Sequence, residues 1–591
     1  MIEPRIYRAA FLPAVLAVLL VAFSFQSRPP ALPQGLPGDV LFEADTAAGA
    51  ARDLATQTPD RRAGTDGDRE AADVTRRAFL SRRFATSVDR FSEDGVDMLN
   101  VTGRRAGASR RQIVVVAARD ADGVPDLSGS AADTAALIEL ARALGGRAPR
   151  KTVVLASVDG STHGDAGVRR LMTQLDDPDL VDAVVVVDEL GARRSRGPLI
   201  VTWANDHRRG SVGLERTAQA SLRAELGSPT ASDGFFSQLP RLALPIGVGA
   251  QGVLGSGGFD ALRISGSGEL DAPDVREIDP ERFGALGRSA LRLLSALDSG
   301  GAPEHGPRSY LTASTKLMPQ WAITLLVAAL LLPPLVASVD AFARARRQHE
   351  PVGRWFAWVG AGVAAVLLAY LVAVLYVVAG AVPDPPPAPL QPGAVHLDGG
   401  AAAGIALALL VGVGAWFFGQ RLVGHRLQLM ERPGAGAGVA IALCLSAGGI
   451  VVWVLNPYAA LVLVPAVHAW TLVALTRVGR GWALGLVAAG LVPIGLLALF
   501  YVLRFNLGPL DAAWYWFLLV TGDQTGVVAA VLGCVLGGLL LAVAALAIAG
   551  RNAPPPRSAR RDSGPRPAVF GPGGHAGPGA LGGTRSSGSR R

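Results

Sequence analysis

The chain has 591 residues, half of them apolar, and a formal charge of +8. This length exceeds what one hydrophobic core usually serves, so we expect at least two structural units. The arginines are gathered in particular loops, so the positive charge alone does not indicate a nucleic-acid-binding protein. Cys444 and Cys534 both lie in apolar runs, which excludes disulfides and thiolate metal sites from the rest of the chain.

The N-terminal segment combines a basic start with an apolar run from Ala9 to Phe25. Arg5 and Arg8 before such a run are typical of a cleaved signal peptide or of a signal anchor. Ala22-Phe23-Ser24 is a poor cleavage site, which favours an anchor. Both alternatives export the segment that follows.

The exported segment alternates helical and strand patterns. Amphipathic helical periodicity occurs at residues 68–81, 131–144, 211–226 and 280–297. Short β-branched runs separate them, at residues 112–117, 152–158, 183–187 and 199–202. Continuous apolar strands suit a sheet that is covered on both faces, so the pattern predicts an α/β domain.

From Pro319 the sequence changes to seven apolar segments, each long enough to cross about 30 Å of hydrocarbon as a helix. They lie near 321–338, 355–380, 401–418, 436–455, 458–476, 482–503 and 525–549. Arginines follow the first, third, fifth and seventh segments and are nearly absent from the alternate loops. This positive-inside pattern predicts a multi-pass protein of the cell membrane with both termini cytoplasmic and residues 27–319 extracytoplasmic.

These patterns divide the chain into seven parts. The expected parts are a cytoplasmic N-terminus at 1–8, a signal-anchor helix at 9–26, a Pro-rich stem at 27–38, the α/β domain at 39–300, a linker at 301–319, a seven-helix transmembrane domain at 320–550 and a disordered basic cytoplasmic tail at 551–591. The stem is expected to hold the domain off the membrane in an extended form. The bias toward Arg, Ala and Gly is typical of a high-GC bacterial genome.

Six short motifs follow one another in the exported segment. They are PDRRAGT at 59–65, Asn100-Val101, IVVVAARD at 113–120, TAALIELARAL at 134–144, the strand and turn at 152–167, and VVVVDELG at 184–191. In this order they resemble the di-zinc aminopeptidases (clan MH, peptidase family M twenty-eight), over residues 50 to 300. The resemblance implies a mixed sheet flanked by helices, here joined to an all-α multi-span transmembrane bundle.

The resemblance also implies where zinc ligands should lie, and most of them are missing. The positions of the first ligand histidine, the bridging aspartate, the general-base glutamate and the next ligand glutamate are those of Ala118, Gly129, Ser161 and Thr162. The last ligand histidine should fall between Gly266 and Asp271, where the sequence has none. Asp188 is retained as a ligand, and Asp120 as the residue that orients the first histidine.

One carboxylate cannot hold two divalent cations against water, and the base that would activate the water is missing too. We therefore predict a degenerate metallopeptidase domain without metal, cofactor or catalytic residues, acting as a non-catalytic binding or scaffold pseudoenzyme. The expected partners are the lipid bilayer and an envelope protein or peptide, and no nucleic acid.

Three alternatives stay open. A metallopeptidase that keeps zinc could use Asp120, Asp126, Asp133 and Asp188 as unconventional ligands. A polar turn with Asp159, Ser161, His163 and Asp165 invites comparison with a hydrolytic triad, but neighbours along one turn usually point apart, so we expect a polar loop.

A transporter with an accessory domain would need ionisable groups inside the spans, where His468 stands nearly alone and is expected to form an interhelical hydrogen bond. His207 is expected in a surface loop.

Overall fold

The computed structural model describes most of the chain up to residue 549. The described residues are 8, 11–35, 41–121, 125–146, 148–175, 178–195, 197, 199–227, 234–270, 275–313, 315–381, 390–392, 397–426, 435–522 and 524–549. The expected cytoplasmic tail at 551–591 lies outside this set, as does the expected cytoplasmic N-terminus apart from Arg8.

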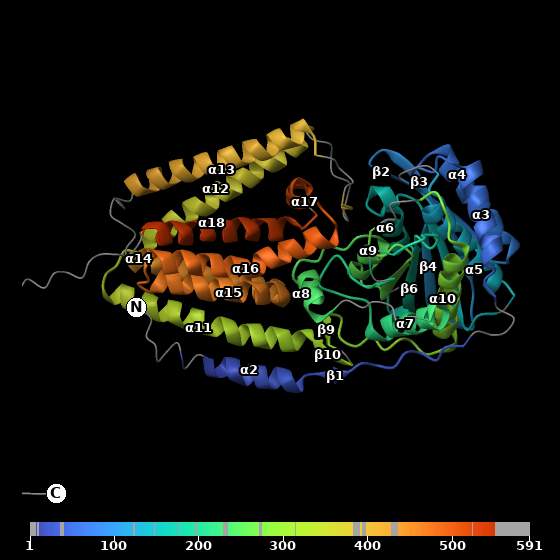
Figure 1. Ribbon diagram of the computed structural model, residues 1–591, viewed down its shortest axis with the longest axis horizontal. Coiled ribbons are helices and arrows are strands. Elements are labelled where there is room, and N and C mark those ends of the chain that lie inside the picture. Colours follow the sequence, from blue (N-terminus) through green and yellow to red (C-terminus); the bar gives the residue numbers. More distant parts are fainter. Residues whose placement is uncertain are drawn as a thin grey trace, which may run out of the picture. The chain divides into compact units, whose positions relative to one another are not determined.

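A seven-stranded mixed sheet forms the centre of the N-terminal part, as predicted (Figure 1). Its order is β2-β3-β5-β4-β6-β8-β7. The strands are β2 (Ala85–Glu93), β3 (Val96–Arg105), β4 (Ser109–Ala118), β5 (Lys151–Val158), β6 (Val181–Asp188), β7 (Ile200–Val201) and β8 (Ala261–Ser265). Strands β5, β4, β6 and β8 run parallel, and the remaining pairs are antiparallel.

Helices cover both faces of this sheet. They are α3 (Ala44–Gln57), α4 (Asp66–Ser81), α5 (Ala132–Leu144), α6 (Ala166–Met172), α7 (Val212–Leu226), α9 (Ala250–Ser256) and α10 (Pro280–Ser299), whereas α8 (Phe235–Ala243) packs against α15 and β9. In β4, Ile113 and Val115 face the core under α3, α5, α7 and α10, whereas Val114 and Val116 face the core under α6 and α9. Because successive side chains of a strand point to opposite faces, two apolar cores explain why β4 reads as a continuous valine run.

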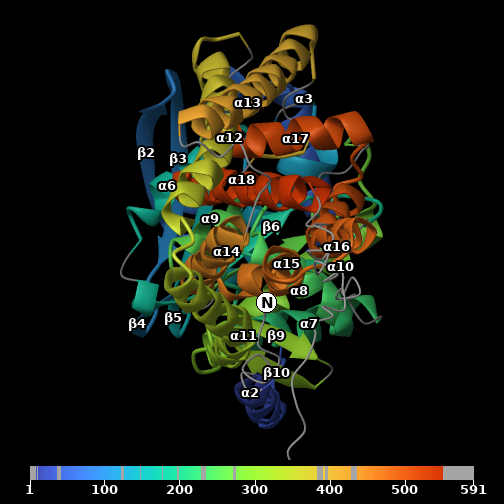
Figure 2. The ribbon, with the colours of Figure 1, turned by 90° about the vertical axis from the view of Figure 1, so that its left-hand side faces the viewer.

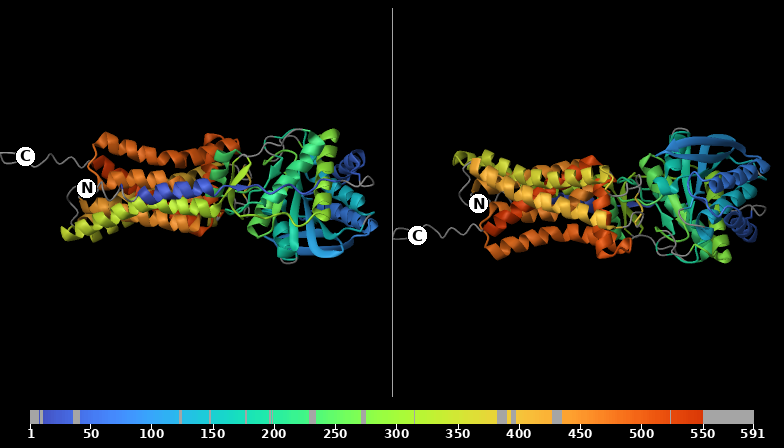
Figure 3. Two further views of the ribbon diagram at one scale, coloured as in Figure 1. Left: turned by 90° about the horizontal axis from the view of Figure 1, so that it is seen from below. Right: turned by 90° about the horizontal axis from the view of Figure 1, so that it is seen from above.

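The described residues contain seven helices that are long and apolar enough to cross a membrane. They are α11 (Gln320–Arg347), α12 (Val352–Val378), α13 (Gly399–Arg426), α14 (Ala435–Leu455), α15 (Pro457–Leu475), α16 (Arg480–Arg504) and α18 (Val527–Ala549). Figure 3 shows these long helices running side by side. Their length and composition make the chain a multi-pass membrane protein.

The expected anchor helix at 9–26 is described from Phe11 onward, since residues 9 and 10 lie outside the described residues. In α2 (Phe11–Phe23) 13 residues are helical, which corresponds to about 20 Å of rise, and α2 packs along α11. The chain then becomes extended, and β1 (Gln26–Ser27) joins β10 (Lys316–Pro319) and β9 (Tyr310–Ala313) in a three-stranded sheet. The predicted linker at 301–319 therefore contains a hairpin of β9 and β10. Each strand has four residues, which is too short to show a clear alternating pattern.

The Pro-rich stem is bound to the α/β domain along α7. The Leu32 amide donates to the Thr217 hydroxyl at 3.1 Å, and the Ser221 hydroxyl donates to the Gln34 side-chain oxygen at 2.8 Å. The described part of the predicted stem thus lies against the domain.

Helix α8 connects the α/β domain with the long helices. The Asn456 amide group donates to the carbonyl oxygen of Leu242 at 2.8 Å, and the Tyr501 hydroxyl donates to that of Leu244. Helix α17 (Pro509–Thr521) buries Trp514 and Tyr515 nearby, in an apolar cluster with Tyr501.

Candidate functional site

The sequence-predicted site positions come together at the carboxyl ends of the parallel strands. Ala118 is the last residue of β4 and pairs with Val158, the last residue of β5. Asp188 is the last residue of β6, the other neighbour of β4. Parallel strands bring their carboxyl ends to one edge, where α/β proteins commonly bind ligands.

The turn after β5 is hydrogen-bonded to Asp120. The backbone amides of Ser161 and Thr162 donate to the Asp120 carboxylate at 3.0 and 3.2 Å. Burial raises the pKa of Asp120 above its ordinary value, against the lowering effect of the Ser161 amide. At the positions of the two expected glutamates, backbone amides thus fasten this turn to the end of β4.

Gly129 cannot carry a side chain without displacing Asp126. It lies in a distorted turn at residues 127–131 with φ −94° and ψ −115°. A Cβ atom on Gly129 would lie 2.4 Å from Asp126 Oδ1, while Asp126 Oδ2 accepts a hydrogen bond from the Ser130 amide at 2.8 Å. The Asp126 carboxylate therefore occupies the space that a bridging aspartate at position 129 would need.

Asp133 is engaged by the backbone that follows β6. Its carboxylate accepts hydrogen bonds from the amides of Glu189 and Leu190 at 2.8 and 2.9 Å. Burial, and then the neighbouring carboxylate of Asp188, raise the pKa of Asp133 well above its ordinary value. Asp133 thus fixes the start of α5 to the end of β6.

Asp188, the retained ligand position, forms an ion pair with Arg263. Arg263 Nη1 lies 2.9 Å from Asp188 Oδ2, with the arginine side chain 4% exposed and the aspartate 25% exposed. Arg263 stands on β8, which neighbours β6, and its Nη2 donates to the Glu269 carbonyl oxygen at 2.9 Å. A fixed guanidinium thus supplies positive charge to this carboxylate.

A second buried arginine, Arg119, lies between Ala118 and Asp120 in the sequence. The Arg119 guanidinium donates to both Asp68 carboxylate oxygens, at 2.8 and 2.7 Å, and lies 3.6 Å from Asp159. Burial and the Asp68 carboxylate raise the pKa of Asp159 to about 8. Arg119 thus pairs with Asp68, while the neighbouring Asp159 is favoured in its neutral form near pH 7.

A di-zinc centre does not fit these side chains. Two zinc ions need a bridging carboxylate and further N or O ligands on each ion. Asp120 and Asp133 each accept two backbone amides, and Asp188 is paired with Arg263. Within the described ranges, no group of three His, Cys, Asp or Glu side chains could hold a metal ion.

The polar turn does not assemble a hydrolytic triad. His163 Nδ1 lies 3.1 Å from the Thr162 hydroxyl, whereas Asp159 accepts hydrogen bonds from the amides of Leu99 and Gly160. Burial, with the Asp120 carboxylate as the next cause, raises the pKa of Asp165 to about 7. These side chains serve different partners, which agrees with the prediction of a polar loop.

His207 and His468 lie in other parts of the described structure. His207 lies in the loop after β7. His468 Nε2, on α15, lies 2.8 Å from the Leu330 carbonyl oxygen of α11, so the predicted interhelical hydrogen bond is confirmed.

The segment where the last ligand histidine was expected instead contributes a buried carboxylate to an ion-pair network. Glu269 is paired with Arg241 of α8 and with Arg504, the last residue of α16; the Arg504 contact measures 2.6 Å. Burial alone would raise the pKa of Glu269, but the guanidiniums of Arg241 and Arg504 outweigh it and lower the pKa to about 2. Asp271 lies outside the described residues.

The two ion-pair groups share one segment. Arg263, which pairs with Asp188, also donates to the backbone carbonyl of Glu269. Sequence reasoning missed the three arginine partners, Arg241, Arg263 and Arg504. The usable signal was an arginine inside the apolar strand run ALRIS at 261–265, because a buried charge requires a partner.

Comparisons with known proteins found likenesses only among solved structures. No family model and no curated protein sequence matches the chain. The chain is similar to a zinc aminopeptidase from Bacillus subtilis, with 10% identity and a TM-score of 0.38 over 45% of this chain and 98% of that one. It is also similar to glutaminyl cyclases from Porphyromonas gingivalis, with 16% identity and a TM-score of 0.36 over 43% and 98%, and from an Acidobacteriales bacterium, with 17% identity and a TM-score of 0.36 over 46% and 100%.

Proposed function

We propose that this chain is a membrane-anchored binding or scaffold protein whose α/β domain is a pseudoenzyme. The domain holds a partner outside the membrane and does not hydrolyse it. This role suits a domain that is bonded to several membrane helices, through Asn456 of α15 and Arg504 of α16.

The ion pair of Asp188 with Arg263 carries this proposal. A metal ligand must offer its lone pairs to the cation, and here a buried guanidinium takes that place at 2.9 Å. A cation entering beside Arg263 would meet like charge in a poorly solvated setting, which costs several kcal/mol in order of magnitude. The alternative of a zinc enzyme with unconventional aspartate ligands would need this pair to open.

The outward orientation of the domain is part of the same proposal. Helix α11 follows the domain and ends with Arg344, Arg346 and Arg347 in its last turn. Cytoplasmic loops carry such an excess of arginine, so the opposite end of α11, next to the domain, faces outward.

Amide hydrolysis tests the proposed lack of catalysis. The full chain in lipid nanodiscs would be incubated with a panel of aminoacyl p-nitroanilides, with and without a chelator, beside an Asp188→Asn variant. We expect the two proteins to release the same background of p-nitroaniline. Chelator-sensitive release that Asp188→Asn abolishes would refute the pseudoenzyme.

A further inference from the structure

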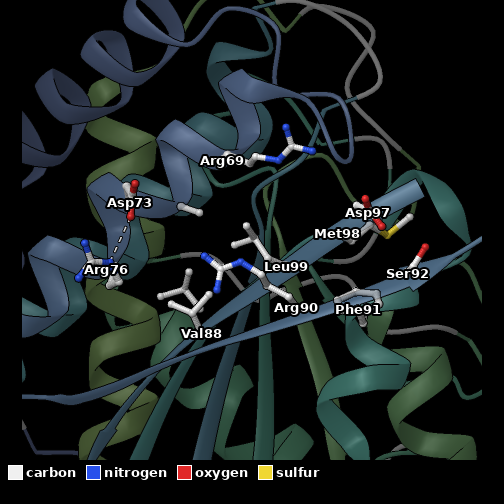
Figure 4. A pocket seen from close by; sticks show the side chains of 12 residues that line it. Arg69, Asp73, Arg76, Val88, Arg90, Phe91, Ser92, Asp97, Met98 and Leu99 are labelled. Atoms are coloured by element: carbon white, nitrogen blue, oxygen red, sulfur yellow. Dashed lines mark hydrogen bonds and ion pairs between the residues drawn. The ribbon is translucent and has the colours of Figure 1, made fainter. Parts of the chain in front are cut away.

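A groove lies between helix α4 and the β2–β3 hairpin (Figure 4). Its volume is about 700 Å³. The lining residues come from α4 and from the two strands: Arg69, Ala72, Asp73, Arg76, Val88, Arg90, Phe91, Ser92, Asp97, Met98, Leu99 and Val101. None of them belongs to the carboxylate site at the strand ends, so the groove is a separate feature.

The groove combines an apolar floor with basic side chains. Val88, Leu99 and Val101 contribute apolar surface, and arginines stand above it on α4 and β2. Arg69 and Arg76 form exposed ion pairs with Asp66 and Asp73, at 2.6 and 3.1 Å. Such pairs contribute little energy in water, so their arginines can exchange partners readily.

Arg90 differs from the two helix arginines. It is exposed on β2 and has no ion-pair partner in the part of the chain that the structure describes. In Figure 4 its guanidinium extends over the groove toward Arg76. The groove therefore presents a cationic group that is free to bind an anionic side chain.

The strand beside the groove is an open sheet edge. Strand β2 has nine residues and, among the strands of the described ranges, pairs with β3 alone, and Figure 2 shows it at the outer side of the sheet. Ion pairs of Asp89 with Arg170 and of Glu93 with Arg169 tie its opposite face to α6. A long edge strand held in place offers a row of unpaired amide and carbonyl groups to another chain.

We propose that the groove and the β2 edge together bind an extended, acidic peptide segment of a partner protein. The segment adds a strand beside β2, and its alternate side chains lie next to Val88, Arg90 and Ser92 over the groove. Strand addition obtains affinity from main-chain hydrogen bonds and specificity from every second side chain. The acidic peptide would be the ligand of the binding role proposed above, so this inference rests on that role.

Charge selects an acidic segment over a basic or neutral one. Three arginines and two aspartates line the groove. The flanking chain adds three exposed arginines, Arg77, Arg82 and Arg83, and three exposed carboxylates, Asp66, Glu70 and Asp94. Acidic side chains at alternate positions of the added strand would face this surface, which favours encounter as well as binding. The open edge favours a peptide over a polysaccharide polyanion, because only a peptide backbone can pair with β2.

Fluorescence anisotropy with defined probes tests the proposal. The probe is a labelled nine-residue peptide of alternating Val and Glu, compared with its Val–Lys counterpart, with two versions N-methylated at alternate residues in either register, and with heparin. The protein is the full chain in nanodiscs of neutral lipid. Arg90→Glu is the test variant, and Arg77→Glu, on α4 and outside the lining, is the charge-matched control.

We expect the Val–Glu peptide to bind, the Val–Lys peptide to bind at least about fivefold more weakly, and Arg90→Glu to lose about fivefold in affinity, as expected for reversing one exposed charge. Arg77→Glu should change affinity less than Arg90→Glu. At least one N-methylated version should lose binding, because methylation removes the ladder donors.

Three results would overturn the proposal: equal binding of the Glu and Lys peptides, no loss with either N-methylated version, or Arg90-dependent binding of heparin without binding of the peptide. An unchanged thermal transition of Arg90→Glu would show that the exposed substitution leaves the fold intact. Because neither zinc nor Asp188 enters this assay, its failure would leave the proposed absence of catalysis standing.

Discussion

The ion-pair network around Glu269 yields the sharpest prediction about stability. Glu269→Gln keeps the shape of the side chain but removes the negative charge between Arg241 and Arg504, whose side chains are 1% and 21% exposed. Removing one partner of a buried ion pair leaves an uncompensated charge, which costs about 3–5 kcal/mol. The substitution should therefore destabilise the fold strongly.

The lowered pKa of Glu269 expresses the same interaction as a dependence of stability on pH. A folded-state pKa of about 2, compared with an ordinary value of 4.5, corresponds to about 3 kcal/mol of stabilisation. Because the folded pKa is the lower one, this stabilisation is complete above pH 4.5 and is lost as the pH falls toward 2. For the α/β domain, a loss of this size lowers the melting temperature by roughly 6–12 °C.

Thermal unfolding of the full chain in nanodiscs, followed by circular dichroism, measures both effects. The matched control is Glu225→Gln, because Glu225 also accepts hydrogen bonds from two arginines, Arg288 and Arg292, at 2.8 and 2.5 Å. Arg288 is 38% and Glu225 11% exposed, compared with 1% for Arg241 and 3% for Glu269, so solvent screens this pair more and its loss should cost about 1 kcal/mol or less.

Equal melting temperatures for Glu269→Gln and Glu225→Gln at pH 7 would refute this reasoning. So would a Glu269→Gln variant that keeps the full acid sensitivity of the wild type between pH 4.5 and pH 2, since the titrating group would then lie elsewhere.

Three further predictions concern the site and its orientation. Arg263→Met and Asp188→Asn should each lower the free energy of unfolding of the domain by about 2 kcal/mol, and the double variant should lower it by less than the sum. Chemical unfolding of the three variants and the wild type measures this, and strictly additive losses would contradict the ion pair. Gly129→Ala should cost about 1–3 kcal/mol by the same measurement, because its Cβ meets Asp126 Oδ1 at 2.4 Å; Gly129→Ala combined with Asp126→Ala should recover part of the loss, and no recovery would count against the steric cause. A cysteine at exposed Asp53 should react with a membrane-impermeant maleimide in intact cells; reaction only after permeabilisation would reverse the proposed topology.

The parts of the fold that depend on local periodicity could be predicted from the sequence. The valine run of β4, the amphipathic pattern of α10 and the seven apolar helices each carry their signal within one continuous segment. The hairpin of β9 and β10 and the short strand β8 could not, because each of these strands has five residues or fewer.

The candidate site, too, could be predicted from the sequence only in part. The resemblance placed Asp120, Ser161 and Asp188 at the ends of successive strands, and the structure brings them to one edge. The partner of Asp188 depends on β8 lying next to β6, and Arg263 is 75 residues away in sequence. Such a contact follows from sheet order, which a single sequence does not encode locally.

The metal content of the purified chain tests the central claim most directly. The full chain would be expressed with added zinc, dialysed against metal-free buffer, and assayed for zinc and protein by mass spectrometry, beside Asp188→Asn. If Arg263 supplies the positive charge beside this carboxylate, both proteins will hold far less than one zinc ion per chain. One or more tightly held ions in the wild type, lost in Asp188→Asn, would contradict the account.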